Sequence, residues 1–211
     1  TAHRNRHVIR QSRRLSGQII IKSETARGRI VMEPYGPVEF TYAKPVADAI
    51  ARSDTFTHWL VSKTCFSKHA PFAVSLYRQQ LHKRSKGILY WWRNYFVGEN
   101  SCRCKNCGGR ETDILAIFDG KDDFRFGLHM EIKTPNDRLG ADQALNYRKR
   151  AECWAGRDSA PRTVLPHDSA TTVILASQTY LESGDPQISQ FETAISFEEI
   201  ATMISPYPQP D

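Results

Sequence analysis

The sequence predicts an α/β fold in which helices flank a mixed central sheet. Between residues 112 and 204, short apolar runs typical of strands alternate with segments that have helical spacing. The chain has 211 residues, of which 40% are hydrophobic and 25% charged, a composition typical of a globular protein. We expect a basic N-terminal arm over residues 1–16 and a single domain over residues 17–211, with its core at about 45–205.

Short elements are expected in the first hundred residues. The expected strands cover residues 17–21, 29–32 and 88–97, and the expected helices cover 45–52, 55–64 and 71–82. Asp54 is the expected N-cap of the second helix, and Pro71 falls in the first turn of the third. The strand at 88–97 is rich in aromatic residues, including Trp91 and Trp92. These rings either pack into the core or stack on the bases of a bound nucleic acid.

The second half of the chain gives clearer patterns. An antiparallel hairpin is expected from a strand at 112–118, a turn at 119–123 and a strand at 124–133. A loop at 134–137 leads into a helix that runs to about residue 154. Four of its residues share one face at helical spacing: Ala144, Tyr147, Ala151 and Trp154. The remaining expected elements are strands at 171–176 and 191–196 and a helix at 197–204.

Charged residues gather at the open end of the expected hairpin. Side chains two apart on a strand share a face, so Glu131 and Lys133 point the same way, together with His129. Counting back from the turn places Asp113 near Glu131. Two carboxylates suit Mg²⁺ or Mn²⁺, and a lysine beside them can orient a water for attack on phosphorus. The alternative interpretation is an ordinary salt bridge between Glu131 and Lys133 on the surface of the sheet.

The helix that follows carries Gln143 and Tyr147 four residues apart, with Arg150 one turn further on. With these residues the chain resembles the PD-(D/E)XK nuclease superfamily, which has the restriction-endonuclease-like fold. The matching segments are 111–115, 130–133 and 143–147, and the last resembles the Gln-x-x-x-Tyr motif of the RecB-like branch. Asp113 and Glu131 are 18 residues apart, in the expected strand–strand–helix context.

The resemblance implies a metal-dependent deoxyribonuclease that hydrolyses phosphodiester bonds and leaves a 5′-phosphate and a 3′-hydroxyl. It implies that Asp113 and Glu131 hold the metal ion and that Lys133 positions the attacking water. Gln143 and Tyr147, with Arg150 beside them, would contact the nucleic-acid backbone or brace the site. The alternative function is a catalytically inactive nucleic-acid-binding or assembly module on the same fold.

One feature departs from the family pattern. Many members place an acidic residue on the first core helix, but this chain has no glutamate between Phe40 and Gly98. Several acidic residues could take that place, and the sequence leaves the choice open: Glu39, Asp48, Asp54, Glu99 and Glu111.

Three cysteines form a second candidate metal site. Cys102, Cys104 and Cys107 have the tight spacing of a zinc-binding turn. A structural Zn²⁺ needs a fourth ligand, for which the candidates are Cys65, Cys153, His58 and His69. The alternatives are free cysteines in a loop or an iron–sulfur cluster, whose ligand spacing fits less well. The odd total of five cysteines argues against a secreted disulfide framework and indicates an intracellular protein, cytoplasmic or nucleoid-associated.

The charge distribution predicts a polyanionic partner. The net charge is +6, and residues 1–162 carry +13 whereas the last 49 residues carry −7. A basic body suits DNA, with RNA the less favoured partner, and the arm at 1–16 would lie along the phosphates. The alternative is a charge that serves solubility alone. No apolar run has the roughly 20 residues of a membrane span, so a membrane protein is excluded. A homodimer is expected where both strands must be cut.

Overall fold

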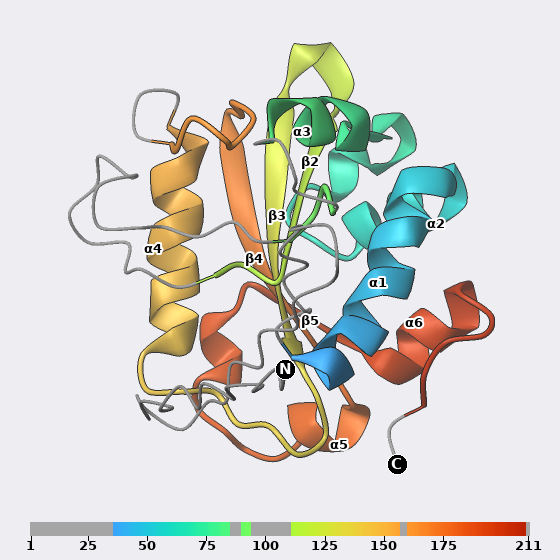
Figure 1. Cartoon of the computed structure of the whole chain (residues 1–211), viewed down its shortest axis with the longest axis vertical. Coiled ribbons are helices and arrows are strands. Elements are labelled where there is room, and N and C mark those ends of the chain that lie inside the picture. The colour runs from blue at the N-terminus through green and yellow to red at the C-terminus, as the bar shows by residue number, and fades with distance from the viewer. Residues whose placement is uncertain (1–35, 85–89, 94–110, 157–159, 210–211) are drawn as a thin grey trace, which may run out of the picture. The chain divides into compact units, whose positions relative to one another are not determined.

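The computed structural model describes residues 36–84, 90–93, 111–156 and 160–209, drawn in colour in Figure 1. The expected basic arm, the expected strands at 17–21 and 29–32, and the cysteine turn at 102–107 lie outside these residues.

The described strands form one mixed sheet in which strands that follow one another in sequence are neighbours. They are β1 Val74–Ser75, β2 Ile114–Asp119, β3 Arg125–Lys133, β4 Ser169–Ala176 and β5 Thr193–Ser196. β1, β2 and β3 pair antiparallel, whereas β4 pairs parallel to β3 and β5 parallel to β4. The predicted mixed sheet and the predicted β2–β3 hairpin are therefore confirmed.

Helices cover both faces of the sheet (Figure 1). One face packs against α1 Pro37–Arg52, α2 Asp54–Ser62 and α6 Phe197–Met203, and the other against α4 Gln143–Ala155. The shorter helices are α3 Tyr77–Lys83 and α5 Gln178–Leu181, with the 3₁₀ turns η1 Ser67–Phe72, η2 Lys121–Asp123 and η3 Ile188–Gln190. Within the described residues, no helix combines the length and the apolar character needed to cross a membrane.

The two faces of β3 differ in chemistry. Its even-numbered residues Phe126, Leu128, Met130 and Ile132 join the main apolar core with α1, α2 and α6. Successive side chains on a strand point to opposite faces, so the odd-numbered residues, among them Glu131 and Lys133, face α4. The polar residues of the strand therefore lie on the α4 face of the sheet.

Three local expectations are wrong. The helix expected at 71–82 is divided into η1, β1 and α3, because Val74 and Ser75 pair with Asp119 and Phe118 of β2. α1 begins at Pro37 rather than at residue 45. The N-cap of α2 is Ser53 and not Asp54, since the Ser53 hydroxyl accepts a hydrogen bond from the backbone N–H of Phe56 at 3.1 Å.

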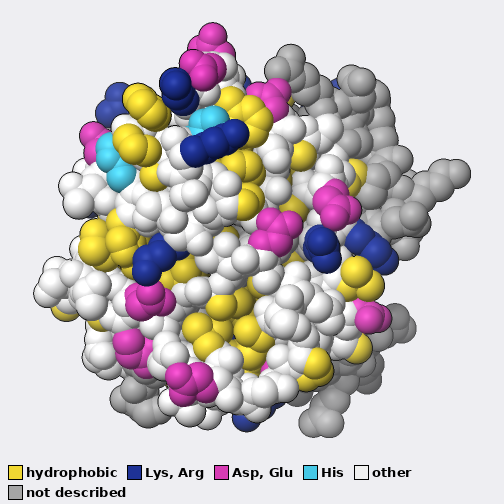
Figure 2. All heavy atoms as spheres, turned by 180° about the vertical axis from the view of Figure 1, so that it is seen from behind, with side chains coloured by type: hydrophobic (Ala, Val, Ile, Leu, Met, Phe, Trp, Pro, Cys, Tyr) yellow, Lys and Arg dark blue, Asp and Glu magenta, His cyan; other side chains and the backbone are white. Residues whose placement is uncertain are grey.

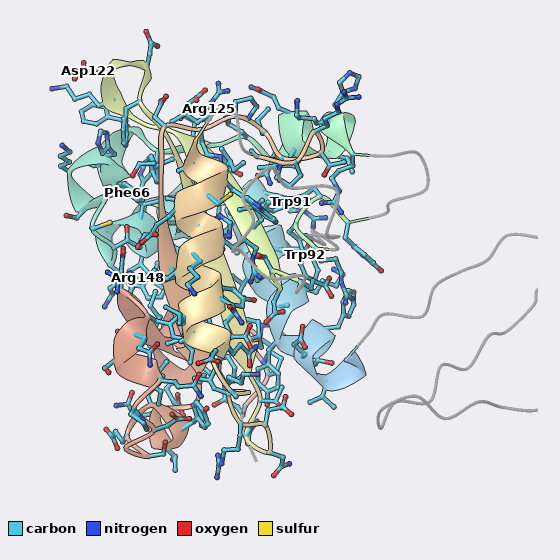
Figure 3. All side chains as sticks on the ribbon, turned by 90° about the vertical axis from the view of Figure 1, so that its left-hand side faces the viewer. Phe66, Trp91, Trp92, Asp122, Arg125 and Arg148 are labelled. Atoms are coloured by element: carbon cyan, nitrogen blue, oxygen red, sulfur yellow. The ribbon has the colours of Figure 1, made fainter. Side chains whose placement is uncertain are left out.

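The aromatic segment expected as a strand belongs to the core. Residues 90–93, its described part, form a bend rather than a strand. Trp91 and Trp92 are buried, with 7% and 3% of their surfaces exposed, and both join the core beneath α1 (Figure 3). The core interpretation is confirmed, and these two rings are not open to a nucleic-acid base.

The edge of β2 beyond β1 is covered by other parts of the chain. The buried Gln80 side chain of α3 donates to the Leu115 carbonyl at 3.0 Å and accepts from the Ile117 N–H at 2.9 Å. The Leu76 N–H donates to the Ile117 carbonyl, and the Trp92 carbonyl accepts from the Leu115 N–H, both at 2.9 Å. An amide side chain thus takes the place of a neighbouring strand and protects an edge that would otherwise pair with other chains.

We predict that Gln80→Ala lowers the free energy of unfolding by about 2–4 kcal/mol, because it leaves two buried backbone groups of β2 without partners, at about 1–3 kcal/mol each. Urea denaturation measures the change. Gln79→Ala is the matched control on the same helix, since Gln79 is exposed and its removal should stay within about 0.5 kcal/mol. Equal stability of the two variants would contradict this role.

Candidate active site

The pairing of β2 with β3 brings Asp113 and Glu131 together. Ile114 pairs with Met130, and continuing this register by one residue sets Asp113 opposite Glu131. Asp113 Oδ2 accepts a hydrogen bond from the backbone N–H of Ile132 at 2.8 Å. The predicted juxtaposition of the two carboxylates is confirmed.

Glu131 and Lys133 form an ion pair that is buried. Lys133 Nζ lies 2.8 Å from Glu131 Oε1, and 2% and 8% of the two residues are exposed. The interpretation of this pair as an ordinary surface salt bridge is therefore wrong. Glu131 Oε1 also accepts from Gln143 Nε2 at 2.5 Å, whereas the buried Glu131 Oε2 has no hydrogen-bond partner in the described structure. A carboxylate oxygen without a partner inside the protein is costly, so this atom is open to a ligand.

The residues predicted on α4 hold the acidic pair in place. Gln143, the first residue of α4, bonds Glu131, and its Oε1 accepts from the Gly140 N–H at 2.9 Å. The Tyr147 hydroxyl accepts from the backbone N–H of Asp113 at 3.1 Å. Gln143 and Tyr147 thus support one carboxylate residue each from the same face of one helix.

Arg150 lies one turn further along α4 and is fully buried. Its Nε donates to the Thr112 hydroxyl at 2.8 Å, and its Nη2 donates to the Glu111 carbonyl at 3.2 Å. The guanidinium stacks over the Tyr147 ring at 4.4 Å. Of the two roles left open by the sequence, the burial of Tyr147 and Arg150 favours bracing of the segment before β2 over contact with a nucleic-acid backbone.

Glu39, on the first turn of α1, is the acidic residue that lies within electrostatic reach of this pair. Burial and the negative charges of Glu131 and Glu111 raise the pKa of Glu39 to about 8. Among the other candidates, Asp48 pairs with Lys44 on α1, and Glu99 lies outside the described residues. The sequence named Glu39 without preferring it, because nothing in a linear pattern shows that the start of α1 lies beside the open end of the hairpin.

The charges in the site are unbalanced. Burial, followed by the charges of Glu131 and Glu39, raises the pKa of Asp113 well above its ordinary value. Burial lowers the pKa of Lys133, but the neighbouring Glu131 and Asp113 carboxylates outweigh this effect and raise it. Lys133 is therefore an ammonium, and one such charge does not neutralise the three carboxyl groups. The site favours an additional cation.

The described residues do not form a complete metal site on their own. Nowhere in the described part of the chain do three His, Cys, Asp or Glu side chains converge closely enough to hold a metal ion. The candidate fourth zinc ligands lie apart: Cys65 is exposed between α2 and η1, whereas Cys153 packs with the apolar cluster under α4. At most one of these two cysteines can therefore complete a zinc site with the turn at 102–107.

Comparison of the chain with protein-family models, with curated proteins and with solved structures finds no match.

We predict that Glu39→Gln weakens the loss of stability between pH 4.5 and about 8 in the metal-free protein. Glu39 loses its proton near pH 4.5 in the unfolded chain but near pH 8 in the folded chain. Unfolding therefore releases a proton in this interval and becomes more favourable as the pH rises, and a glutamine removes this contribution. Free energies of unfolding in urea and chelator at several pH values measure the effect.

Asp48→Asn is the matched control, since Asp48 is a partly exposed carboxylate on the same helix. A Glu39→Gln variant whose stability follows the same pH curve as the wild type would show that Glu39 lies free of the other carboxylates.

Proposed function

We propose that the chain is a metal-dependent nuclease of the PD-(D/E)XK type, with a restriction-endonuclease-like core, that hydrolyses phosphodiester bonds in DNA. The observation that carries the proposal is the Asp113, Glu131 and Lys133 cluster, which is mostly buried and leaves Glu131 Oε2 without a partner. The strand–strand–helix order around these residues agrees with the family resemblance.

The carboxylates fit Mg²⁺ or Mn²⁺. Mg²⁺ keeps several waters and takes one or two protein carboxylates together with phosphate oxygens, so a full protein cage is not required. Asp113 and Glu131 would hold the ion, and Glu39 would supply a third carboxylate from α1. When bound, the ion would offset the negative charge of the reacting phosphate and promote ionisation of the attacking water.

Lys133 would act on the attacking water. Its ammonium is held by Glu131 Oε1 at 2.8 Å, so the side chain is fixed on the same face of β3 as the carboxylates. From there Nζ can donate a hydrogen bond that orients the water or stabilises a phosphate oxygen in the transition state.

The side chains of α4 would keep this geometry fixed. Catalytic groups need to be held to within a fraction of an ångström, and Gln143 and Tyr147 each bond one of the acidic residues or its backbone. Arg150 secures the segment that leads into Asp113. We propose a bracing role for all three residues.

Two further proposals come from the sequence. DNA is favoured over RNA as the substrate, and a homodimer is the assembly suited to cutting both strands. A structural Zn²⁺ at Cys102, Cys104 and Cys107 is tested by metal analysis of protein purified without chelator. Zinc at one ion per chain, lost in Cys104→Ser, is the expected result.

The second candidate function is an inactive nucleic-acid-binding module. A purely structural role for Glu131 would be expected to satisfy both of its oxygens, whereas Oε2 has no partner in the described structure. This observation favours the nuclease over the inactive module.

We predict that Asp113→Asn and Glu131→Gln each abolish cleavage of plasmid DNA in the presence of Mg²⁺, because each removes a charge that the metal ion needs. Both variants should remain folded and keep most of their DNA affinity, as measured by circular dichroism and fluorescence anisotropy. Asp48→Asn is the control carboxylate outside the site and should cleave normally. Cleavage by either site variant at the wild-type rate would refute the assignment.

Lys133→Ala is expected to lower kcat by about two to four orders of magnitude, the usual effect of a positioned proton-handling group. Affinity for Mg²⁺ should change little because both carboxylates remain, and affinity for DNA should fall only modestly. Single-turnover kinetics with titrated DNA separate kcat from binding. Parallel losses in turnover and in DNA affinity would instead identify Lys133 as a phosphate clamp.

A further inference from the structure

A groove of about 470 Å³ opens beside α3. Its lining residues are Arg78, Gln79, His82, Lys83 and Leu165. Four of them are exposed polar or charged residues of α3, and Leu165 is a nearly buried apolar residue from the segment before β4. The groove thus combines an apolar wall with a row of hydrogen-bond donors.

The described lining of the groove is cationic and holds no carboxylate. Neither Arg78 nor Lys83 forms an ion pair with any acidic side chain of the described residues. The face seen from behind Figure 1 differs, because basic and acidic side chains are interspersed over it (Figure 2). A groove whose charges are all of one sign and unpaired suits an anionic ligand.

Arg78 is held ready for such a ligand. Its Nε donates to the Tyr77 hydroxyl at 2.9 Å, and its guanidinium lies over the Tyr77 ring at 5.6 Å. The Tyr77 ring in turn packs against the buried Trp91 at 6.1 Å. A guanidinium supported in this way loses less side-chain freedom when it binds a phosphate than a free surface arginine would.

The groove has a defined position relative to the candidate active site. α3 is fastened to β2 by Gln80 at Leu115 and Ile117, which follow Asp113 by two and four residues. At about 3.3 Å per residue, these points lie roughly 7 and 13 Å along the strand from Asp113. A DNA strand advances about 3.4 Å per nucleotide, so this distance corresponds to roughly two to four nucleotides.

We propose that the α3 groove binds the phosphate backbone of the DNA, roughly two to four nucleotides from the bond that is cut. This inference rests on the proposed function, which supplies the class of ligand. Arg78 and Lys83 contact phosphate oxygens, and Gln79 and His82 supply further hydrogen bonds. Contacts of this kind fix the register of the DNA without reading its sequence.

The test compares two double variants in the Asp113→Asn background, where the DNA stays intact. Arg78→Ala with Lys83→Ala removes both cations of the groove. Lys44→Ala with Lys68→Ala removes the same charge from α1 and η1, outside the groove. Binding of a short fluorescent duplex is measured by anisotropy over a range of salt concentrations, and thermal denaturation confirms that each variant is folded.

The groove variant is expected to lower the slope of log K against log salt by up to about 1.8, at about 0.9 for each duplex phosphate contact. At about 0.1 M salt this corresponds to roughly eightfold weaker binding for one lost contact and roughly sixtyfold for two. The control variant should bind nearly as the parent does. Restoring the charges by Arg78→Lys with Lys83→Arg should recover most of the affinity, whichever partner atoms are used.

Equal binding by the groove variant and its parent overturns the proposal, and so do equal losses in the groove and control variants, which would reflect net charge alone. The nuclease proposal is decided separately by plasmid cleavage. Cleavage with an indifferent groove refutes the groove only, whereas a groove-dependent affinity without any cleavage refutes the nuclease only.

Discussion

The hydrogen bond from the Ile132 N–H to Asp113 Oδ2 closes the open end of the β2–β3 hairpin, and the candidate site is arranged around it. It continues the register of the two strands by one side chain, so the Asp113 carboxylate stands beside Glu131. A strand slipped by one residue would turn Glu131 into the apolar core beneath α1 and α2. The apolar residues on the opposite face of β3 therefore set the register on which the acidic pair depends.

α4 converts this register into a fixed site. Its side chains bond Glu131, the Asp113 backbone and the segment before β2, while its apolar residues pack on β4. A fully buried arginine such as Arg150 is tolerated in a protein interior only when its donors and its charge find partners. The Thr112 hydroxyl, the Glu111 carbonyl and the Tyr147 ring are among the partners that it finds, so the helix and the start of β2 behave as one unit.

The site opposes stability in a way that is typical of functional centres. Three carboxyl groups raise one another's proton affinity, and the Lys133 ammonium offsets only part of their repulsion. The rest of the fold supplies the stability that this arrangement consumes, through a core on both faces of the sheet and a β2 edge covered by Gln80. A bound cation would relieve the same repulsion, which couples metal binding to the stability of the protein.

Local periodicity was sufficient to locate part of this protein and insufficient for the rest. Alternation along the hairpin placed Glu131 and Lys133 on one face, counting from the turn placed Asp113 beside them, and helical spacing aligned Gln143 with Tyr147. Each of these relations depends only on the geometry of one strand, one turn or one helix.

The remaining features depend on contacts between segments that are distant in sequence. The division of the segment at 71–82 follows from pairing of Val74 and Ser75 with β2, which overrides a local preference for helix. Only packing of α1 on the sheet brings Glu39 to the carboxylates, and only burial turns the Glu131–Lys133 pair from a surface feature into part of a site. Residue spacing carries short-range geometry, whereas burial and long-range proximity arise when the elements pack.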